Sequence, residues 1–409
     1  MASFMTSLSM PLVQYAKDNP VAGIGQTRYA KNMGRTEVDL ASEAIRAACA
    51  DAGVGVPAID GFVSYHIEQV AEAELVTTLG IPDLRFMART PSGGGGAASL
   101  VGLAAIAVSS GAAECVVAFR SRNRSKAASY GADPNQGGRP WAKAGDRLRD
   151  FRQWQHPFGV ASPAQEMALI ARRHMHVYGT RAEHFGMQAV AQRFHASRNP
   201  DAIMREPITL DDWAASRPIA EPIRLLDCSL ENDGAAAVLV TSLERARDLA
   251  QAPVPVLSQV QYGAPIHTEL AAFFATTSAF GEREGGAVVA GRRLFGAAGV
   301  TPADVDVAMI VEPFTIAVPL ALEQYGFCAM GEGGPFIESG ATRWPEGVLP
   351  VNTHGGSTGE AFVHGVNHLP EAVRQLRGTA CNQVAGAEVA FVCGAISDPA
   401  GAVLLGIDR

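Results

Sequence analysis

Four side chains in the second half of the sequence have the chemistry of acid–base or thiol catalysis. Glu312 ends an apolar run and precedes Pro313. His354 and His364 lie on either side of a glycine-rich segment, and Cys393 lies within VAFVCGA. A carboxylate in an apolar pocket has a raised pKa and can act as a general base, and neutral imidazole is the commonest acid–base group near neutral pH. These four residues are therefore the candidate catalytic groups.

Each candidate also has a structural interpretation. An acid after a strand, such as Glu312, is often solvated or caps the next turn. A lone histidine, such as His354 or His364, is more often a hydrogen-bonded structural residue. Cys393 fits a buried strand thiol, because free cysteines are among the most buried residues. The residue types alone leave both interpretations open.

Two glycine clusters accompany these side chains. The first, GGGG at 93–96, precedes a helix-like segment rich in Ala and Val, and the second, Gly355–Gly356, follows NTH. Glycine lets a backbone approach a ligand closely. The backbone N–H groups at a helix N-terminus also stabilise developing negative charge. We therefore expect the glycines to contribute to a substrate site.

The elements that position these residues alternate between strand-like and helix-like patterns. Strands are predicted at 21–25, 59–65, 114–119, 235–241, 255–262, 305–311, 388–393 and 403–407. Helices are predicted at 37–52, 97–110, 165–178, 286–298, 316–325 and 361–376, the first with Thr36 as its N-cap. This order predicts a largely parallel sheet covered on both faces, and it places His364 in the first turns of the last helix.

The same rhythm occurs twice, which predicts two halves related by duplication. We expect an N-terminal extension at 1–20, a first half at 21–250 and a second half at 251–409. An insertion at about 120–222 interrupts the first half and begins with the basic run Arg120–Lys126. Such a run is usually a solvated loop or an interface, and the alternative is contact with the phosphates of coenzyme A.

Composition narrows the class of protein. The 409 residues carry a formal net charge of −8, which disfavours a general nucleic-acid binder. The six cysteines form no CxxC pair, so we expect no metal site within this chain. No apolar run reaches the roughly 18 residues of a membrane span, and residues 1–20 lack the pattern of a secretory signal. These features predict a cytoplasmic globular protein.

Seven segments in order resemble the thiolase superfamily, in particular its sterol-carrier-type lipid-transfer thiolases and thiolase-like steroid side-chain aldolases. The segments are GIGQTRYAKNMGRTE, the GGGG helix, AFRSRNRS, SPAQEMALIARRHMH, EPIRLLDCSLENDGAAAVLV, LEQYGFCAMGEGGPFI and LPVNTHGGSTGEAFVHGVNHLPEAVRQLRG. The resemblance implies an α/β thiolase fold, with duplicated five-stranded halves in a layered αβαβα core and a long insertion in the first half. It also implies a homodimer.

The resemblance assigns roles to individual positions. Gly94 occupies the position of the thiolase nucleophilic cysteine, so a covalent acyl-enzyme cannot form there. Phe362 stands where thiolases have a histidine and the aldolases a tyrosine, and Val311 stands where a tyrosine or histidine is usual. Cys393 matches the second thiolase cysteine. The candidate substrate-binding residues are Gly93, Gly94, Gly95, Gly96, Asn352, Gly355, Gly356 and Phe362.

The function that the resemblance implies is retro-aldol cleavage of a β-hydroxyacyl-CoA of the steroid or bile-acid side-chain type. One alternative is a non-catalytic subunit that binds acyl-CoA or lipid, and another is an acyltransferase that works without a covalent intermediate. No bound cofactor is expected, because coenzyme A is part of the substrate. A small partner protein with an OB fold and a zinc ribbon is also implied.

Overall fold

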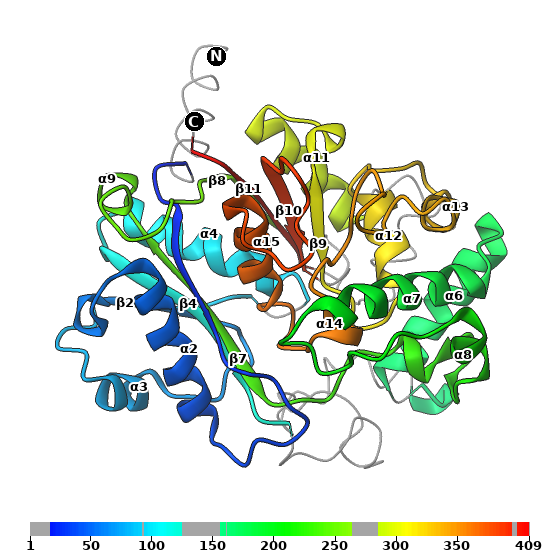
Figure 1. Cartoon of the computed structure of the whole chain (residues 1–409), viewed down its shortest axis with the longest axis horizontal. Coiled ribbons are helices and arrows are strands. Elements are labelled where there is room, and N and C mark those ends of the chain that lie inside the picture. The colour runs from blue at the N-terminus through cyan, green and yellow to red at the C-terminus, as the bar shows by residue number, and fades with distance from the viewer. Residues whose placement is uncertain are drawn as a thin grey trace.

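The structure is a computed structural model that describes residues 17–91, 94–124, 156–160, 162–263, 285–394 and 399–408. Gly93 and most of the predicted N-terminal extension lie outside these ranges. The described chain contains two main sheets, with helices on their faces and between them (Figure 1).

The first sheet has the strand order β1-β7-β4-β2-β3. Its strands are β1 (Val21–Gln26), β2 (Gly61–Ser64), β3 (Phe86–Arg89), β4 (Cys115–Arg122) and β7 (Gly234–Thr241). β7 pairs antiparallel with both β1 and β4, whereas β2 pairs parallel with β3 and β4. Four of the five strands therefore run in the same direction, in agreement with the prediction of a largely parallel sheet, and β7 is the antiparallel exception that inserts between β1 and β4.

The second sheet repeats this arrangement with the order β8-β11-β10-β9. Its strands are β8 (Val256–Tyr262), β9 (Val307–Ile310), β10 (Val389–Cys393) and β11 (Ala400–Gly406). The pairings are antiparallel, antiparallel and parallel, as in the first sheet. A single parallel bridge between Ala308 and Val351 occupies the position equivalent to β3. Among the described residues, the second half thus has four strands and a bridge where five strands were predicted.

Helices complete five layers. α2 (Glu37–Ala52) and α3 (Glu72–Leu79) cover the outer face of the first sheet, and α11 (Gly286–Ala298) and α12 (Ala317–Gln324) cover that of the second. α4 (Gly96–Ser109) and α15 (His368–Arg377) lie between the sheets (Figure 1). α4 is built almost entirely from small and aliphatic residues and is buried on most sides, which allows it to pack between two sheets.

Helix boundaries follow local chemistry where the signals are strong. Thr36 caps α2 by accepting a hydrogen bond from the Asp39 amide at 3.2 Å, as predicted. Gly53, with φ +75°, ends that helix in the left-handed conformation. α11 has the predicted bounds.

The insertion of the first half packs on the second half. It contains α6 (Pro163–Tyr178), α7 (Ala182–Arg198), α8 (Leu210–Ala215), β5 (Pro218–Ala220) and β6 (Ile223–Arg224). A buried apolar cluster joins Phe185 of α7 and Trp213 of α8 to Leu320 of α12. α7 also packs on α13 (Gly333–Glu338) and α14 (Gly356–Gly359), as Figure 1 shows. The insertion therefore helps to enclose the region that carries Glu312.

The remaining short elements connect these layers. They are α9 (Leu243–Ala246) and the 3-10 turns η1 (Val56–Ala58), η2 (His156–Phe158), η3 (Leu225–Asp227) and η5 (Pro302–Asp304).

The helix predicted at 361–376 begins only at His368. His364 and Gly365 have φ values of +52° and +85°, in the left-handed region that ends a right-handed helix. His364 consequently lies in a loop before α15, not on the helix.

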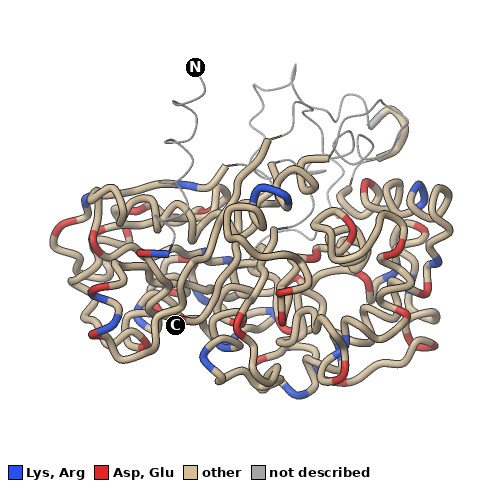
Figure 2. The backbone as a smooth tube through the Cα atoms, turned by 90° about the horizontal axis from the view of Figure 1, so that it is seen from above, with Lys and Arg blue, Asp and Glu red and all other residues tan. Residues whose placement is uncertain are grey.

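Charged residues of both signs are interspersed over the periphery of the molecule (Figure 2). None of the helices in the described ranges combines the length and the apolar character needed to cross a lipid bilayer.

Candidate active site

Glu312 lies just beyond the C-terminal end of β9 and is fully buried. Its Oε1 accepts hydrogen bonds from Gln192 Nε2 and from the Ser357 amide, each at 2.5 Å. Its Oε2 accepts from Asn352 Nδ2 at 2.9 Å and from the Ser357 hydroxyl at 3.3 Å, and it lies 3.3 Å from His368 Nε2. Both oxygens are therefore saturated with donors, an arrangement that orients neighbouring groups.

The segment around Asn352 packs against the Glu312 carboxylate. The Asn352 side chain also pairs with both backbone groups of Ile310, at 2.8 Å each, and so extends the edge of β9. Gly356 has φ +62°, and a Cβ atom on it would overlap Glu312 Oε1. Gly355 has φ +109° and faces Ala196 of α7. The second glycine cluster thus allows the backbone to approach Glu312 and α7 closely.

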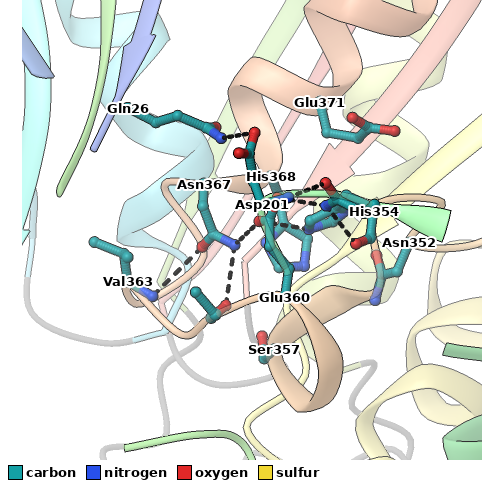
Figure 3. Close-up of polar contacts among 12 residues, drawn as sticks. Gln26, Asp201, Asn352, His354, Ser357, Glu360, Val363, Asn367, His368 and Glu371 are labelled. Carbon is teal, nitrogen blue, oxygen red and sulfur yellow. Dashed lines mark hydrogen bonds and ion pairs between the residues drawn. The ribbon is translucent and has the colours of Figure 1, made fainter. Parts of the chain in front are cut away.

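His354 belongs to a layer of buried polar groups that also contains Glu360, Asn367 and His368 (Figure 3). Its ring packs edge-to-face on His368 at 4.6 Å between centroids. Its Nε2 lies 3.7 Å from Glu360 Oε2, and neither ring nitrogen has a hydrogen-bond partner within the described ranges. Burial, and then the neighbouring His368, holds the pKa of His354 well below its usual value, so the ring is neutral near pH 7.

Glu360 is the carboxyl group of this layer. Asn199 Nδ2 donates to its Oε1 at 3.0 Å, and Asn367 Nδ2 donates to its Oε2 at 2.8 Å. Burial raises the pKa of Glu360 to about 8. The group is therefore mostly protonated near neutral pH and can serve as a hydrogen-bond donor.

His364 lies in the loop before α15 and is only partly buried. Arg120 Nε donates to its Nδ1 at 3.3 Å, and the ring stacks on Tyr65 at 5.4 Å between centroids. Burial, followed by the charge of Arg120, lowers the pKa of His364 well below its usual value. In the neutral ring the acceptor is Nδ1, so Nε2 carries the hydrogen and acts as a donor.

The basic run at 120–126 begins inside the protein. Arg120 forms a buried ion pair with Glu68 at 3.1 Å. Arg122 Nη1 donates to the Phe362 carbonyl at 2.7 Å, and its guanidinium lies 5.1 Å from the centre of the Phe362 ring. The interpretation of this run as a surface loop or interface is therefore wrong for these two arginines, because both belong to the central strand β4. Residues 125–126 lie outside the described ranges.

The first glycine cluster packs against the second sheet. Gly94 and Gly95 contact Gly394 and Gly401 so closely that a Cβ atom on Gly95 would overlap the backbone at 399–401. A Cβ atom on Gly96 would lie 2.9 Å from the Tyr65 ring. This turn starts α4, so its amide groups lie at the N-terminal end of that helix.

Cys393 ends β10, directly before Gly394, and is fully buried. Burial raises the pKa of its thiol, so it is protonated at neutral pH. Its carbonyl accepts a hydrogen bond from the Val311 amide at 3.2 Å.

The structure places the predicted residues in two adjoining groups. The first, around Glu312, contains Asn352, His354, Gly355 and Gly356. The second, around the glycine turn, contains Gly94, Gly95, Gly96, Phe362, His364 and Cys393. The groups meet where Gly365 packs on Val311. Gly93 lies outside the described residues.

Three polar residues of the site were not predicted from the sequence: Gln192, Ser357 and His368. His368 starts α15, and the direction of its side chain could not be predicted because the helix was expected to begin at 361. Gln192 comes from α7 in the insertion, 120 residues before its partner Glu312, and no spacing in the sequence connects the two.

Comparison with known proteins gives near full-length matches. Residues 279–404 match the family model described as "Thiolase C-terminal domain-like". The chain is 41% identical over 387 residues to the 17-hydroxy-3-oxo-4-pregnene-20-carboxyl-CoA lyase of Mycobacterium tuberculosis, covering 94% of this chain and 98% of the relative. It is 41% identical over 390 residues to a steroid side-chain-cleaving aldolase of Thermomonospora curvata, covering 95% and 98%.

A solved structure agrees with these sequence matches. The "Ltp2-ChsH2(DUF35) aldolase" superimposes with a TM-score of 0.86 and 38% identity, covering 97% of this chain and 99% of the other.

Proposed function

This chain belongs to the thiolase superfamily, and on that premise we propose that it cleaves a β-hydroxyacyl-CoA by a retro-aldol reaction. The observation that carries the proposal is 41% identity, over almost the whole length of both chains, to two proteins named as a CoA lyase and an aldolase. The chain would then be a carbon–carbon lyase.

The glycine turn supports a mechanism without a covalent intermediate. Gly94 stands where thiolases carry their nucleophile, and glycine offers no side chain to acylate. In retro-aldol cleavage a base takes the hydroxyl proton, and the carbonyl double bond forms as the Cα–Cβ bond breaks. The electron pair of the broken bond enters the enolate of the shortened thioester. Protonation at Cα completes the reaction.

We assign the proton acceptor to the His354–His368 pair. His368 Nδ1 and both ring nitrogens of His354 have no hydrogen-bond partner in the described part of the chain, so acceptor capacity remains. Glu312 has none left, because both its oxygens are saturated. In this proposal Glu312 is a positioning residue that orients His368.

The enolate oxygen needs hydrogen-bond donors. The amide groups of Gly95 and Gly96 at the start of α4 can supply them, and His364 can present Nε2–H from the opposite loop. Tyr65, which contacts both Gly96 and His364, fixes the relative position of these donors.

The substrate class follows from the name of the first relative, which describes a steroid with a 17-hydroxyl group and a 20-carboxyl-CoA thioester. Such a compound is a β-hydroxyacyl-CoA, and we propose a steroid or bile-acid side chain of this type. Coenzyme A is then part of the substrate. A small partner of the DUF35 kind is proposed because the solved neighbour is named as an aldolase with a DUF35 component, and the OB fold and zinc ribbon are what the family resemblance implies for it. A homodimer in the cytoplasm completes the proposal.

A non-catalytic acyl-CoA-binding subunit is the second candidate. Val311 and Phe362 are both apolar and buried, although each stands at a position where the resemblance leads one to expect a titratable side chain. A site without those groups can bind substrate without cleaving it.

The test is to incubate the purified protein, with and without a DUF35-type partner, with β-hydroxyacyl-CoAs and β-ketoacyl-CoAs. Mass spectrometry would follow the thioesters. We expect a shortened acyl-CoA and a carbonyl product from the hydroxy substrates, without added coenzyme A.

The variant His364→Phe should lose most of this activity, and the exposed His176→Gln should keep it. Tight binding without cleavage in every arm would support the binding subunit instead.

A further inference from the structure

Two arginines of β4 contact the loop that carries Phe362 and His364. Arg120 and Arg122 are two residues apart on the strand, so their side chains lie on the same face of the sheet. Arg122 Nη1 donates to the Phe362 carbonyl at 2.7 Å. Arg120 Nε donates to His364 Nδ1 at 3.3 Å. A strand of the first half thus holds this loop of the second half at two points, and one of them is the ring of a candidate catalytic residue.

The Arg120 guanidinium is itself fixed by a buried carboxylate. Its Nη1 donates to Glu68 Oε2 at 3.1 Å, and the Glu68 side chain is fully buried. Further donors hold this carboxylate in place: the amide and hydroxyl of Ser121, at 2.7 and 2.9 Å, and the amides of Gln69 and Val70, at 2.9 and 3.2 Å. Because a guanidinium is planar and rigid, its bond to Glu68 also sets the direction in which its Nε–H group points.

The bond from Arg120 determines which nitrogen of the His364 ring carries the hydrogen. Arginine donates and cannot accept, so Nδ1 is the bare nitrogen and the hydrogen of the neutral ring is on Nε2. In the described part of the chain this is the one hydrogen bond of the His364 side chain, which leaves Nε2–H available to a ligand. The ring is also stacked on Tyr65, at 5.4 Å between centroids and 17° between planes. Its neighbours therefore set both the tautomer and the orientation of His364.

The backbone of His364 supports this interpretation. Its φ is +52°, in the left-handed region that residues other than glycine rarely adopt. Such conformations persist where the surrounding contacts hold them, and they are common at functional sites. The contacts here are Arg120 and Tyr65 on the ring and Arg122 on the Phe362 carbonyl.

We propose that Arg120, anchored by Glu68, is a positioning residue that holds the His364 ring with Nε2–H directed at the enolate oxygen formed in retro-aldol cleavage. Arg120 does not touch the substrate and acts only through the ring. Without its bond the ring can rotate and can carry its hydrogen on either nitrogen, and a misaligned donor stabilises the transition state less. Because His364 is taken as a donor to the enolate, this inference rests on the proposed function.

A double-mutant cycle with a β-hydroxyacyl-CoA as substrate tests the inference. Arg120→Met should lower kcat about 10- to 100-fold and leave KM within about twofold, because it weakens an interaction made in the transition state. In the His364→Phe background the same substitution should change kcat by less than about twofold, since the group that it positions is already absent. Arg247→Met is the control and should keep the wild-type kcat, because Arg247 is exposed and pairs with Asp408.

Nuclear magnetic resonance gives a readout that does not depend on turnover. Long-range 1H–15N spectra of protein labelled in its histidines show which ring nitrogen carries the hydrogen, and the His364→Phe spectrum identifies the His364 signals by their loss. We expect one tautomer, with the hydrogen on Nε2, in the wild type and a mixture in Arg120→Met. Arg122→Met removes a neighbouring charge without removing a bond to the ring, so it should keep the single tautomer.

Arg120→Lys keeps the test decisive if Arg120→Met does not fold, because lysine retains a cation beside Glu68. Its single nitrogen replaces the planar fork that binds Glu68 and His364 through different atoms. Arg120→Lys should therefore lower kcat only where His364 is present, and it should also show the mixture of tautomers.

Equal losses of kcat with and without His364 would overturn the inference, because Arg120 would then act through the fold. A single, unchanged tautomer in both Arg120 variants would also overturn it. The two proposals fail in different ways. If the wild type cleaves no thioester while the Arg120 variants alter the tautomer, the proposed function fails and the placement of the ring by Arg120 stands. If Arg120→Met cleaves the substrate with the wild-type kcat, the function stands and the positioning role fails.

Discussion

Glu312 lies at the meeting point of three separate parts of the chain. Gln192 comes from the insertion, Asn352 and Ser357 come from the glycine-rich loop, and His368 starts α15. A fully buried carboxylate with this many donors holds the elements together as well as the site.

Replacing Glu312 with Gln should therefore destabilise the fold. The new amide would turn an NH2 group toward at least one existing donor and leave it unsatisfied. We expect the free energy of unfolding to fall by about 2–4 kcal/mol. Denaturant unfolding monitored by circular dichroism measures this.

The matched control is Glu338→Gln, since Glu338 is 46% exposed and pairs with Arg181 at the surface. The Glu338→Gln variant should lose less than about 1 kcal/mol of unfolding free energy. A Glu312→Gln protein with wild-type stability would instead point to a carboxylate that is free to act on substrate.

Glu360 should make stability depend on pH. In the unfolded chain its carboxyl titrates near 4.5, whereas burial raises the pKa of the folded group to about 8. Between these values the folded protein binds more protons at this position, so stability falls as pH rises, by up to about 1.4 kcal/mol per pH unit. The contribution is fully present below the unfolded pKa and is lost as pH rises through the folded pKa.

The variant Glu360→Gln removes this titration. As pH rises from about 5 to about 8, the stability of the variant relative to the wild type should therefore increase. Urea unfolding at several pH values in this range measures it. A difference that does not change with pH would mean that Glu360 is ionised in the folded protein throughout.

At the scale of elements, the sequence predicted the helices and strands that are determined by local residue patterns. Thr36 and the apolar periodicity after it correctly predicted α2, and the apolar run at 235–241 correctly predicted the buried strand β7. The start of α15 was not predictable, because His364 takes its left-handed conformation in contact with Arg120 and Tyr65, which are distant in the sequence. The antiparallel position of β7 likewise depends on the path of the chain through the insertion.

The glycine turn before α4 packs closely against the backbone at the start of β11, and substitutions in the turn measure how close this packing is. Gly95 has φ −67°, so alanine there meets no backbone strain, but its Cβ atom would overlap the backbone of residues 399–401. We expect Gly95→Ala to cost about 3 kcal/mol or more, because the backbone must move to admit the methyl group. Thermal unfolding measures the loss.

Gly296→Ala is the control for this substitution. Gly296 is exposed within α11, and nothing lies within 4 Å of a Cβ atom added there. Alanine should stabilise that helix by about 0.5–1 kcal/mol. Equal effects of the two substitutions would contradict the close packing of the turn.

At the scale of the whole molecule, the two halves share one interior. The largest apolar cluster joins Val116 and Val238 of the first sheet to Val307 and Val392 of the second through α4 and α15. Arg377 of α15 donates hydrogen bonds to Asp51 at 2.7 Å and to the Ala22 carbonyl at 3.0 Å. These bonds also attach the second half to α2 and β1. The insertion belongs to the first half, and it contacts the second half through α7.

This sharing predicts how fragments behave. A fragment of residues 21–250 would expose the inner face of its sheet and lose α15, and a fragment of 251–409 would lose α4 and the insertion. Because each would leave a large apolar face uncovered, we expect neither to fold alone, and the full chain to unfold in one cooperative transition. Dispersed amide resonances in the NMR spectrum of either isolated fragment would contradict this, and would mean that each sheet completes its core with its outer helices alone.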